Sequence, residues 1–213
     1  MVELGYIHSI SESCAKIIVP LSKPYILDKQ KTRQCEVRFD DGRRISAEQR
    51  KKAYAIIGDI SEWSGYTPPE FEKDILKNEY IERTGSEYFS LSDCTVTVAR
   101  DFINFLIDFC FENNIGTRDT LLNRTDDISY YLYSCIANRK CCVCNEKAEI
   151  HHCEGSRVGM GFSRNKISNL GRTAIALCRK HHAQAHNSEK EFFEKHHVYG
   201  IKLDEYLIKR VNL

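Results

Sequence analysis

The sequence predicts an α+β protein with a small N-terminal antiparallel sheet, a helical middle and a C-terminal module rich in cysteine and histidine. Apolar residues alternate over much of residues 1–45, which favours strands, and they recur at helical spacing over residues 46–137. The run CCVCNEKAEIHHCEGS, which begins at Cys141, is followed by LCRKHHAQAH at residues 177–186. With 213 residues, the chain can form one large domain or two small ones with a real core.

Two segments near the N-terminus have the pattern of strands. The first is AKIIVPL, which begins at Ala15, and the second is QCEVRFDDGRRIS, which ends at Ser46. Asp41-Gly42 in the second segment supplies residues suited to the positive φ angles of a hairpin turn. We therefore expect a small antiparallel sheet here.

Start signals and apolar spacing predict four helices in the middle of the chain. Ser46 and Gln49 form a capping box, so the first helix begins at Ala47 and continues to about Trp63. Thr67-Pro68-Pro69-Glu70 opens a second helix, which ends near Gly85. The third helix runs from about Cys94 to Asn113, with Gly116 just beyond its end, and the fourth is DDISYYLYSCIANR. One stripe of the third helix is strongly apolar and is predicted to be a packing face: Val98, Phe102, Phe105, Leu106 and Phe109.

The charge distribution separates the cysteine and histidine region from the rest of the chain. The chain has 31 Lys and Arg against 30 Asp and Glu, a net charge of +1. Residues 138–186 contain nine Lys or Arg and three Glu, a net of +6, so the remainder carries −5. We find neither a signal peptide nor an apolar run near the roughly 20 residues of a membrane span, and we expect a cytoplasmic protein. Its ten cysteines are then better interpreted as reduced thiols and metal ligands than as disulfides.

Four residues at paired spacing predict a structural zinc site. Cys141-x-x-Cys144 is a zinc knuckle, and Cys178-x-x-His181 supplies the two ligands that close a Cys3His tetrahedron. Asn145, which tolerates a left-handed φ angle, follows the knuckle where a tight turn is needed. Cys142 is assigned to the core or to the surroundings of the zinc site. The other cysteines are predicted to be small buried apolar residues: Cys14, Cys35, Cys94, Cys110, Cys135 and Cys153.

The remaining histidines predict a second metal site. His182 and His186 are four residues apart, so they share one face of a helix beginning near Cys178. His151 and His152 lie in a short predicted strand, so they point to opposite faces and only one of them faces the helix pair. A cation held by His151, His182 and His186, with His152 as a base beside it, has the groups needed for phosphodiester hydrolysis. The alternative is that some of these histidines are ordinary packed or surface residues.

The order CVCNEKAEIHH, a loop, and ALCRKHHAQAH resembles the HNH endonuclease family. The resemblance implies a ββα-metal fold in which His152 is the general base and His151, His182 and His186 hold a catalytic cation. It also implies that Cys141, Cys144, Cys178 and His181 are the ligands of the structural zinc. The family's central asparagine falls on Thr173 by position, whereas Asn169 lies four residues earlier. Either Asn169 ties a longer loop to the strand, or Thr173 takes that place.

Two looser resemblances concern the rest of the chain. The segments SRVGMGFSRNKISNLGRTA and EFFEKHHVYGIKLDEYL are similar to HNH nucleases encoded in recombination regions of tailed phages. The segment TVTVARDFINFLIDFCFENNIG resembles the phage NinB/Orf recombination-mediator family, which binds single-stranded DNA. Together with the HNH resemblance, these imply three parts. Residues 1–137 form a β-hairpin plus helical domain for DNA binding or dimerisation, residues 138–187 form the HNH nuclease module, and residues 188–213 form a helical tail packed on the module.

The loop from Glu154 to Arg172 combines four glycines with four basic residues. Glycine lets the backbone approach a phosphate, and a cation then neutralises it. The predicted phosphate contacts are Arg157, Arg164, Lys166 and Arg172. A flexible, solvated connection is the alternative. His196 and His197 are interpreted as the C-terminal end of a helix rather than as ligands.

The sequence therefore predicts a metal-dependent HNH endonuclease that hydrolyses DNA, encoded by a phage or prophage and acting in the cytoplasm of a bacterial host. The expected cofactors are a structural Zn2+ and one catalytic divalent cation, which is Mg2+, Mn2+, Ni2+ or Zn2+. DNA is the expected partner, and no membrane is expected. A homodimer through the apolar helices and a monomer with one buried stripe both fit the pattern. Two other functions remain open: a non-catalytic, zinc-stabilised DNA-binding recombination accessory protein, and a purely structural zinc module that mediates assembly.

Overall fold

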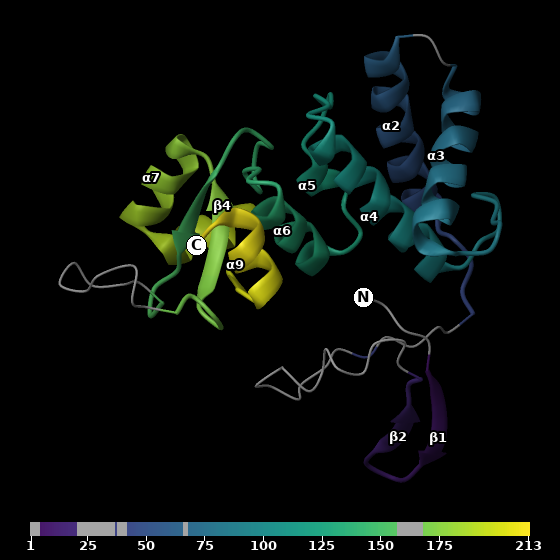
Figure 1. Cartoon of the computed structure of the whole chain (residues 1–213), viewed down its shortest axis with the longest axis horizontal. Coiled ribbons are helices and arrows are strands. Elements are labelled where there is room, and N and C mark those ends of the chain that lie inside the picture. Colours follow the sequence, from purple (N-terminus) through teal and green to yellow (C-terminus); the bar gives the residue numbers. More distant parts are fainter. Residues whose placement is uncertain (1–4, 21–36, 38–41, 66–67, 157–167) are drawn as a thin grey trace. The chain divides into compact units, whose positions relative to one another are not determined.

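The computed structural model describes residues 5–20, 37, 42–65, 68–156 and 168–213. The chain divides into two compact units, Met1–Phe39 and Asp40–Leu213. The predicted α+β class is confirmed, since the described residues contain small antiparallel sheets and helices (Figure 1). None of the described helices has the length and hydropathy of a membrane span.

The first unit contains a two-stranded hairpin. Strand β1 (Tyr6–Ile10) pairs antiparallel with β2 (Ala15–Ile18), from Tyr6 opposite Ile18 to Ile10 opposite Ala15. The predicted strand beginning at Ala15 is confirmed by β2. Most of the segment expected to form a hairpin around Asp41-Gly42 lies outside the described residues, although Gly42 does have a positive φ of 71°.

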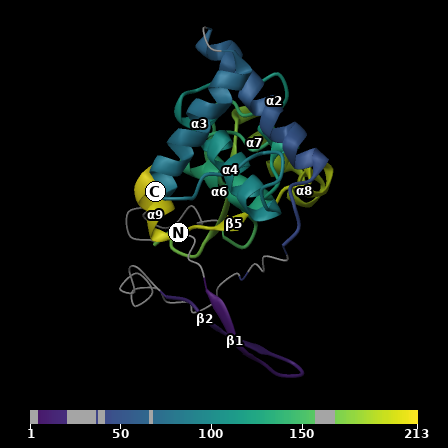
Figure 2. The same cartoon turned by 90° about the vertical axis from the view of Figure 1, so that its right-hand side faces the viewer.

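Three helices form the first part of the second unit, and local signals determine where they begin and end. Helix α2 (Ala47–Ser64) starts at the predicted capping box, because Gln49 N–H donates to Ser46 Oγ (3.0 Å) and Ser46 N–H donates to Gln49 Oε1 (3.1 Å). Helix α3 (Pro69–Thr84) begins with proline and ends at Gly85, which has a left-handed φ of 70°. Helices α2 and α3 lie side by side (Figures 1 and 2).

Helix α4 (Val96–Glu112) packs against both α2 and α3 and carries the predicted apolar stripe. Phe102, Phe105 and Leu106 are buried in the core, and Val98 and Phe109 pack against it. The N–H of Val98 donates to the side chain of Thr95, which caps the start of this helix (3.2 Å). The stripe is therefore a packing face within the second unit, as expected.

Two further helices connect this bundle to the C-terminal sheet. The short helix α5 (Leu121–Arg124) presents Arg124 to Asp59 of α2 in a buried ion pair. Helix α6 (Ile128–Ala137) packs on α4 and on strand β4 (Thr173–Leu177). Helix α6 was expected from the sequence, whereas α5 was not.

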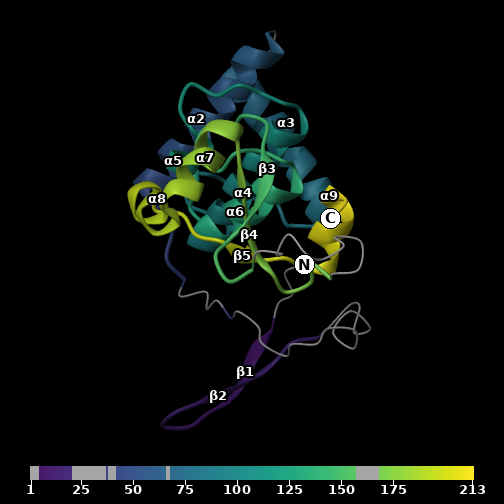
Figure 3. The same cartoon turned by 90° about the vertical axis from the view of Figure 1, so that its left-hand side faces the viewer.

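The C-terminal region is a small antiparallel sheet covered on two faces. Its strand order is β3 (Glu149–His152), β4, and β5 (Ile201–Lys202), and His151 pairs with Ile175. Helix α7 (Arg179–Asn187) covers the face of the sheet opposite to α6 (Figures 1 and 3). Helices α8 (Glu189–His196) and α9 (Glu205–Val211) complete the chain.

Most of the cysteines outside the predicted zinc site are buried, as expected. Cys94, Cys110, Cys135, Cys142 and Cys153 lie in the core, and Cys35 lies outside the described residues. The prediction for Cys14 is wrong, because this thiol is exposed in the turn between β1 and β2. Among the described residues of this unit, 5–20 and 37, all are exposed except the partly exposed Ile17, so they form no core that could bury Cys14.

Candidate metal centre

The first cluster brings together two parts of the chain, Cys141 and Cys144 from one turn and Cys178 and His181 from the start of α7. Their ligand atoms lie within 4.8 Å of one another. Cys144 Sγ is 3.7 Å from Cys178 Sγ, and His181 Nδ1 is 3.3 Å from Cys141 Sγ and 3.2 Å from Cys178 Sγ. A tetrahedral zinc bound at about 2.3 Å from sulfur and about 2.0 Å from nitrogen separates two sulfurs by about 3.8 Å and a sulfur from a nitrogen by about 3.5 Å. The four residues therefore fit a structural Zn2+.

Backbone hydrogen bonds hold the knuckle of this cluster in place. The N–H of Asn145 donates to the carbonyl of Cys141 (2.8 Å), and Asn145 adopts the predicted left-handed φ of 60°. Its side chain accepts a hydrogen bond from the N–H of Leu121 (2.8 Å), which joins the knuckle to α5. Cys142 is fully buried, and its N–H donates to the carbonyl of Ala176 in β4 (3.0 Å). Cys142 thus belongs to the core beside the cluster.

The second cluster consists of three imidazoles, from His151 of β3 and from His182 and His186 of α7. Their ligand atoms also lie within 4.8 Å of one another. The ring centroids of His151 and His182 are 4.8 Å apart, those of His151 and His186 are 4.9 Å apart, and those of His182 and His186 are 4.7 Å apart. The two helical histidines are one turn apart, so α7 presents both of them to the same strand. Three imidazoles at this spacing can hold one transition-metal ion.

Two carboxylates orient the histidines of the second cluster. His151 is 1% exposed, and its Nε2–H donates to Glu189 Oε1 at 2.9 Å. The other carboxylate oxygen of Glu189 accepts a hydrogen bond from the N–H of Glu154 (2.8 Å), which ties α8 to the end of β3. Glu149 Oε2 lies 3.3 Å from His182 Nδ1. Such carboxylate partners set the tautomer of a metal-binding histidine and leave its other ring nitrogen for the ion.

Burial favours the form of His151 that can bind a metal. It lowers the pKa of His151 below the ordinary value for histidine, although the hydrogen bond to Glu189 raises it. The neighbouring His182 and His186 lower the pKa of His151 further. A neutral imidazole has a free lone pair, which a protonated imidazole lacks. His151 is therefore suited to be a ligand at neutral pH.

His152 lies next to this cluster in sequence but is not one of its three imidazoles. It pairs with Ala174 of β4 and is partly exposed, unlike His151. Neighbouring residues of a strand point to opposite faces, which is the arrangement predicted for a base outside the ligand set. The role of His152 as a base stays a prediction.

The loop that follows β3 contains the predicted asparagine and the predicted phosphate contacts. Asn169 is partly buried and its carbonyl accepts the N–H of Arg172 (3.2 Å), but its side chain makes no hydrogen bond with any other described residue. Thr173, the alternative, donates its N–H to Ser156 Oγ (2.9 Å), and its carbonyl accepts the N–H of Cys153 (3.0 Å). Thr173 is thus tied by its backbone to the end of β3.

The guanidinium of Arg172 holds the two ends of the same loop together. It donates to the carbonyl of Ser168 (3.1 Å) and to the carbonyl of Ser156 (2.6 Å). The other three predicted phosphate contacts, Arg157, Arg164 and Lys166, lie outside the described residues. The described contacts of Arg172 are therefore within the protein.

Glu149 and Glu189 were not predicted from the sequence. Glu189 directly follows Ser188, which together with Glu191 resembles a capping box, but Ser188 makes no side-chain cap bond. The only signal for Glu189 is a carboxylate three residues beyond His186, and such spacing is common on helices. His196 and His197 do end a helix as expected, with His197 in a left-handed conformation at its C-terminus.

Strands β3 and β4 of the sheet and helix α7 bring together three histidines that could bind a metal ion, and a second cluster of potential zinc ligands lies at the start of α7. This arrangement is that of a ββα-metal module. The family model described as "Putative HNHc nuclease" matches residues 19–213 of the chain. The protein therefore belongs to this family, as the resemblance implied. No curated protein and no solved structure matches the chain, and none of the comparisons supports a relationship to the NinB/Orf family.

Proposed function

We propose that the protein is a metal-dependent endonuclease that hydrolyses phosphodiester bonds of DNA. The observation that carries the proposal is the meeting of His151 from β3 with His182 and His186 from α7 in a member of an HNH nuclease family. Three imidazoles suit Mn2+, Ni2+ or Zn2+ better than Mg2+, which prefers oxygen ligands. When bound there, such a cation supplies charge that stabilises the scissile phosphate and the leaving oxygen.

The residues of the chain perform the remaining steps. His152 accepts the proton of the attacking water, since an imidazole has a pKa close to the working pH. Glu189 and Glu149 keep His151 and His182 in the orientation that binds the ion. Arg157, Arg164 and Lys166 contact DNA phosphates in the proposal, whereas the loop-holding bonds of Arg172 favour a structural role for it. A role in phage DNA recombination rests on the sequence resemblance alone.

A second candidate is a zinc-stabilised DNA-binding accessory protein without catalytic activity. The observation that favours it is the side chain of Asn169, which makes no hydrogen bond with the described residues although it is the asparagine available for the central motif position. An accessory protein has no use for a base beside a metal. His152 therefore separates the two functions.

Cleavage of supercoiled, branched and single-stranded DNA by the protein and by His152→Ala tests the proposal. With Mn2+, Ni2+, Zn2+ or Mg2+ added, we expect the parent to cut and His152→Ala to lose at least about 100-fold in rate, the typical contribution of a general base. DNA affinity and melting temperature should not change. His197→Asn is the matched control, because His197 is exposed and asparagine tolerates its φ of 52°. Equal loss of binding and cutting in His152→Ala would contradict its assignment as the base.

We further propose that Cys141, Cys144, Cys178 and His181 bind a structural Zn2+. Elemental analysis of protein purified without added metal is expected to find one tightly bound zinc per chain. Cys178→Ser should lose this zinc and lower the free energy of unfolding by about 4 kcal/mol, the contribution of a ligand present at a thousandfold excess over its Kd. Cys14→Ser, at an exposed thiol of the first unit, should keep the zinc. Zinc retained by Cys178→Ser would contradict the assignment.

A further inference from the structure

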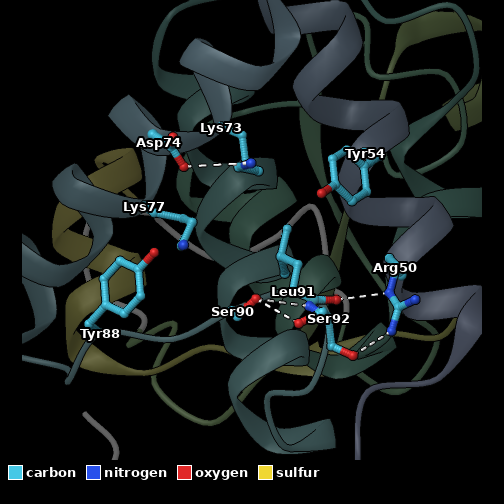
Figure 4. A pocket seen from close by; sticks show the side chains of 9 residues that line it. All are labelled: Arg50, Tyr54, Lys73, Asp74, Lys77, Tyr88, Ser90, Leu91 and Ser92. Carbon is cyan, nitrogen blue, oxygen red and sulfur yellow. Dashed lines mark hydrogen bonds and ion pairs between the residues drawn. The ribbon is translucent and has the colours of Figure 1, made fainter.

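A cleft in the helical part of the second unit lies among elements that take no part in the metal centre. Its volume is about 400 Å3, and α2, α3 and the segment between Tyr88 and Ser92 surround it (Figure 4). Arg50, Lys73 and Lys77 supply three cations, and Asp74 supplies the single carboxylate. The cleft is therefore strongly basic, whereas the chain outside the metal-binding module is acidic overall.

Lys77 is the unusual member of this lining. The residue is only 4% exposed, yet its ammonium makes neither an ion pair nor a hydrogen bond with any other described residue. Its Nζ lies 4.3 Å from the ring centre of Tyr88 and 5.2 Å from that of Phe89, and it points toward the space between Tyr88 and the Ser90–Ser92 turn (Figure 4). The stem of Lys77 is thus covered while its ammonium lines the cleft, where the rings of Tyr88 and Phe89 stabilise the charge in part. An ammonium that faces a cleft without a carboxylate partner among the described residues is suited to meet the anion of a ligand.

The other polar groups of the cleft also suit an anion. Arg50 donates two guanidinium hydrogen bonds to the turn, to the carbonyls of Leu91 (2.8 Å) and Ser92 (2.7 Å). Its remaining N–H donors can bind a ligand. The hydroxyls of Ser90 and Ser92 lie 2.8 Å apart on that turn. Among the described residues, Lys73 has one ion-pair partner, Asp74, and the distance between their charged groups is long, at 3.7 Å. Cations and hydroxyls of this kind are the groups that bind phosphate oxygens.

Two exposed tyrosines beside the cleft distinguish it from a site for phosphate alone. Tyr88 is 76% exposed, and Tyr54 on α2 is 43% exposed. Exposed rings beside a basic groove are the platforms on which the bases of a single nucleic-acid strand stack. Tyr88 has its ring next to the Lys77 ammonium, so a strand whose phosphate met Lys77 would bring its adjacent base over Tyr88.

We propose that this cleft binds a phosphodiester of single-stranded DNA and stacks the neighbouring base on Tyr88. The inference rests on the proposed function, because the cleft would hold the DNA substrate of the same nuclease at a place away from the metal centre. Lys77 and Lys73 neutralise the phosphate, and Arg50 and the serines shape the wall. The cleft contributes affinity and does not take part in bond cleavage.

The test is binding of a fluorescent single-stranded oligonucleotide, measured by anisotropy at several salt concentrations. We expect Tyr88→Ala to weaken binding about tenfold, the effect of one stacked base. Lys77→Met keeps the side-chain volume and should weaken binding while lowering the salt slope by about 0.7. Because Lys77 has no ion pair with any described residue and methionine fills the same covered space, Lys77→Met should melt at about the same temperature as the parent. Lys51→Met, an exposed lysine of α2 outside the cleft, is the matched control and should reduce the affinity less.

Competition and cleavage measurements separate the other outcomes. Inorganic phosphate is added as a competitor of the oligonucleotide. If it displaces the oligonucleotide from the parent and from Lys77→Met at the same high concentrations, the result agrees with a DNA site. If the parent binds phosphate tightly and Lys77→Met does not, while the DNA affinity is the same in both, the cleft is a site for free phosphate and the proposal is overturned. Unchanged DNA affinity in folded Tyr88→Ala and Lys77→Met would also overturn it. Because the assay measures binding, it can support the DNA site even if the protein cuts no DNA. If the protein does cut DNA, the Tyr88→Ala and Lys77→Met variants should have a higher KM and the kcat of the parent.

Discussion

At the scale of single residues, Glu189 uses both oxygens of its carboxylate to connect α8 with β3. One oxygen accepts from the buried imidazole of His151 and the other from the N–H of Glu154. The hydrogen bond from Glu154 holds the carboxylate in one orientation, and the carboxylate then holds the imidazole of His151 in one orientation. The orientation of the proposed metal ligand His151 therefore depends on Glu189, a residue of the tail that follows the module.

Replacement of Glu189 by glutamine should weaken the metal site without unfolding the protein. Glutamine keeps the size of the side chain but loses its charge and one of its two acceptors, so it cannot serve both His151 and Glu154 equally well. We expect the affinity for Mn2+ or Ni2+ to fall about 10- to 100-fold, the usual effect of losing the partner of a metal-binding histidine. Isothermal titration of the zinc-loaded protein with either ion measures this.

The matched control for this change is Glu191→Gln, at an exposed position of the same helix. It removes the same charge from α8 but touches neither His151 nor Glu154. An equal loss of affinity in both variants would mean that the charge of the helix, rather than the bond to His151, determines ion binding.

The two clusters of cysteine and histidine side chains could be predicted from the sequence because the spacing within each pair is local; their role as metal ligands stays a prediction. Cys141 and Cys144 belong to one turn, and His182 and His186 to one helix, so chain geometry alone brings each pair together. Glu189 could not be predicted in the same way, since its bond to His151 depends on how α8 packs after the turn at Ser188. Tertiary packing sets that contact, and no short motif encodes it.

At the scale of elements, Asp108 links α4 to α6. It accepts hydrogen bonds from the hydroxyl of Tyr130 (2.5 Å) and from that of Ser134. Burial raises the pKa of Asp108 above the ordinary value for aspartate, although these two hydrogen bonds lower it. The charged form of Asp108 is therefore harder to accommodate in the folded protein than in the unfolded chain.

The raised pKa predicts a pH-dependent effect of Asp108→Asn. A carboxyl whose pKa is higher in the folded state contributes stability that is fully present below its ordinary pKa of 3.8 and is lost as the pH rises through the folded-state value. Asparagine does not titrate, so the free energy of unfolding of the variant minus that of the parent should increase as the pH rises above about 4 and then level off.

Urea unfolding of both proteins across this pH range measures the difference, since the remaining titrating groups are shared and cancel. Asp93→Asn, at an exposed position of the same unit, is the control for a general loss of one negative charge. A difference that decreases with rising pH would show that the hydrogen bonds from Tyr130 and Ser134 outweigh burial.

The ends of helices that have capping residues and an apolar repeat could be predicted closely from the sequence. Elements that lack these signals could not be predicted. Ser46 and Gln49 define the start of α2, and Gly85 defines the end of α3, as the sequence indicated. The short helix α5 has no apolar repeat, and the buried ion pair of Arg124 with Asp59 and the bond from Leu121 to Asn145 hold it in place. Contacts between distant residues form that element, so periodicity could not reveal it.

At the scale of the whole molecule, the described core belongs to the second unit. The buried apolar residues run from Ile45 to Val211, and none of the described residues before Ile45 is among them. The predicted functional parts at residues 1–137, 138–187 and 188–213 stay a prediction, and the helical middle and the C-terminal module both fall within the unit Asp40–Leu213. The hydrophobic pattern of the sequence locates the helices and strands. It does not reveal that α6 packs on both α4 and β4 and so joins the helical middle to the C-terminal module.

This distribution of the core predicts that a chain beginning at Asp40 folds as the full chain does. The residues of β1 are exposed, as are those of β2 except the partly exposed Ile17, and an isolated two-stranded hairpin contributes little stability in water. Removal of residues 1–39 should therefore change the melting temperature by no more than about 2 °C. Removal of residues 205–213 is the contrasting case: it takes away the buried Leu207 and Val211 of α9 and should lower the free energy of unfolding by about 3–6 kcal/mol. Calorimetry of the two truncated proteins measures both effects, and a large fall in melting temperature on removal of residues 1–39 would mean that the first unit stabilises the second.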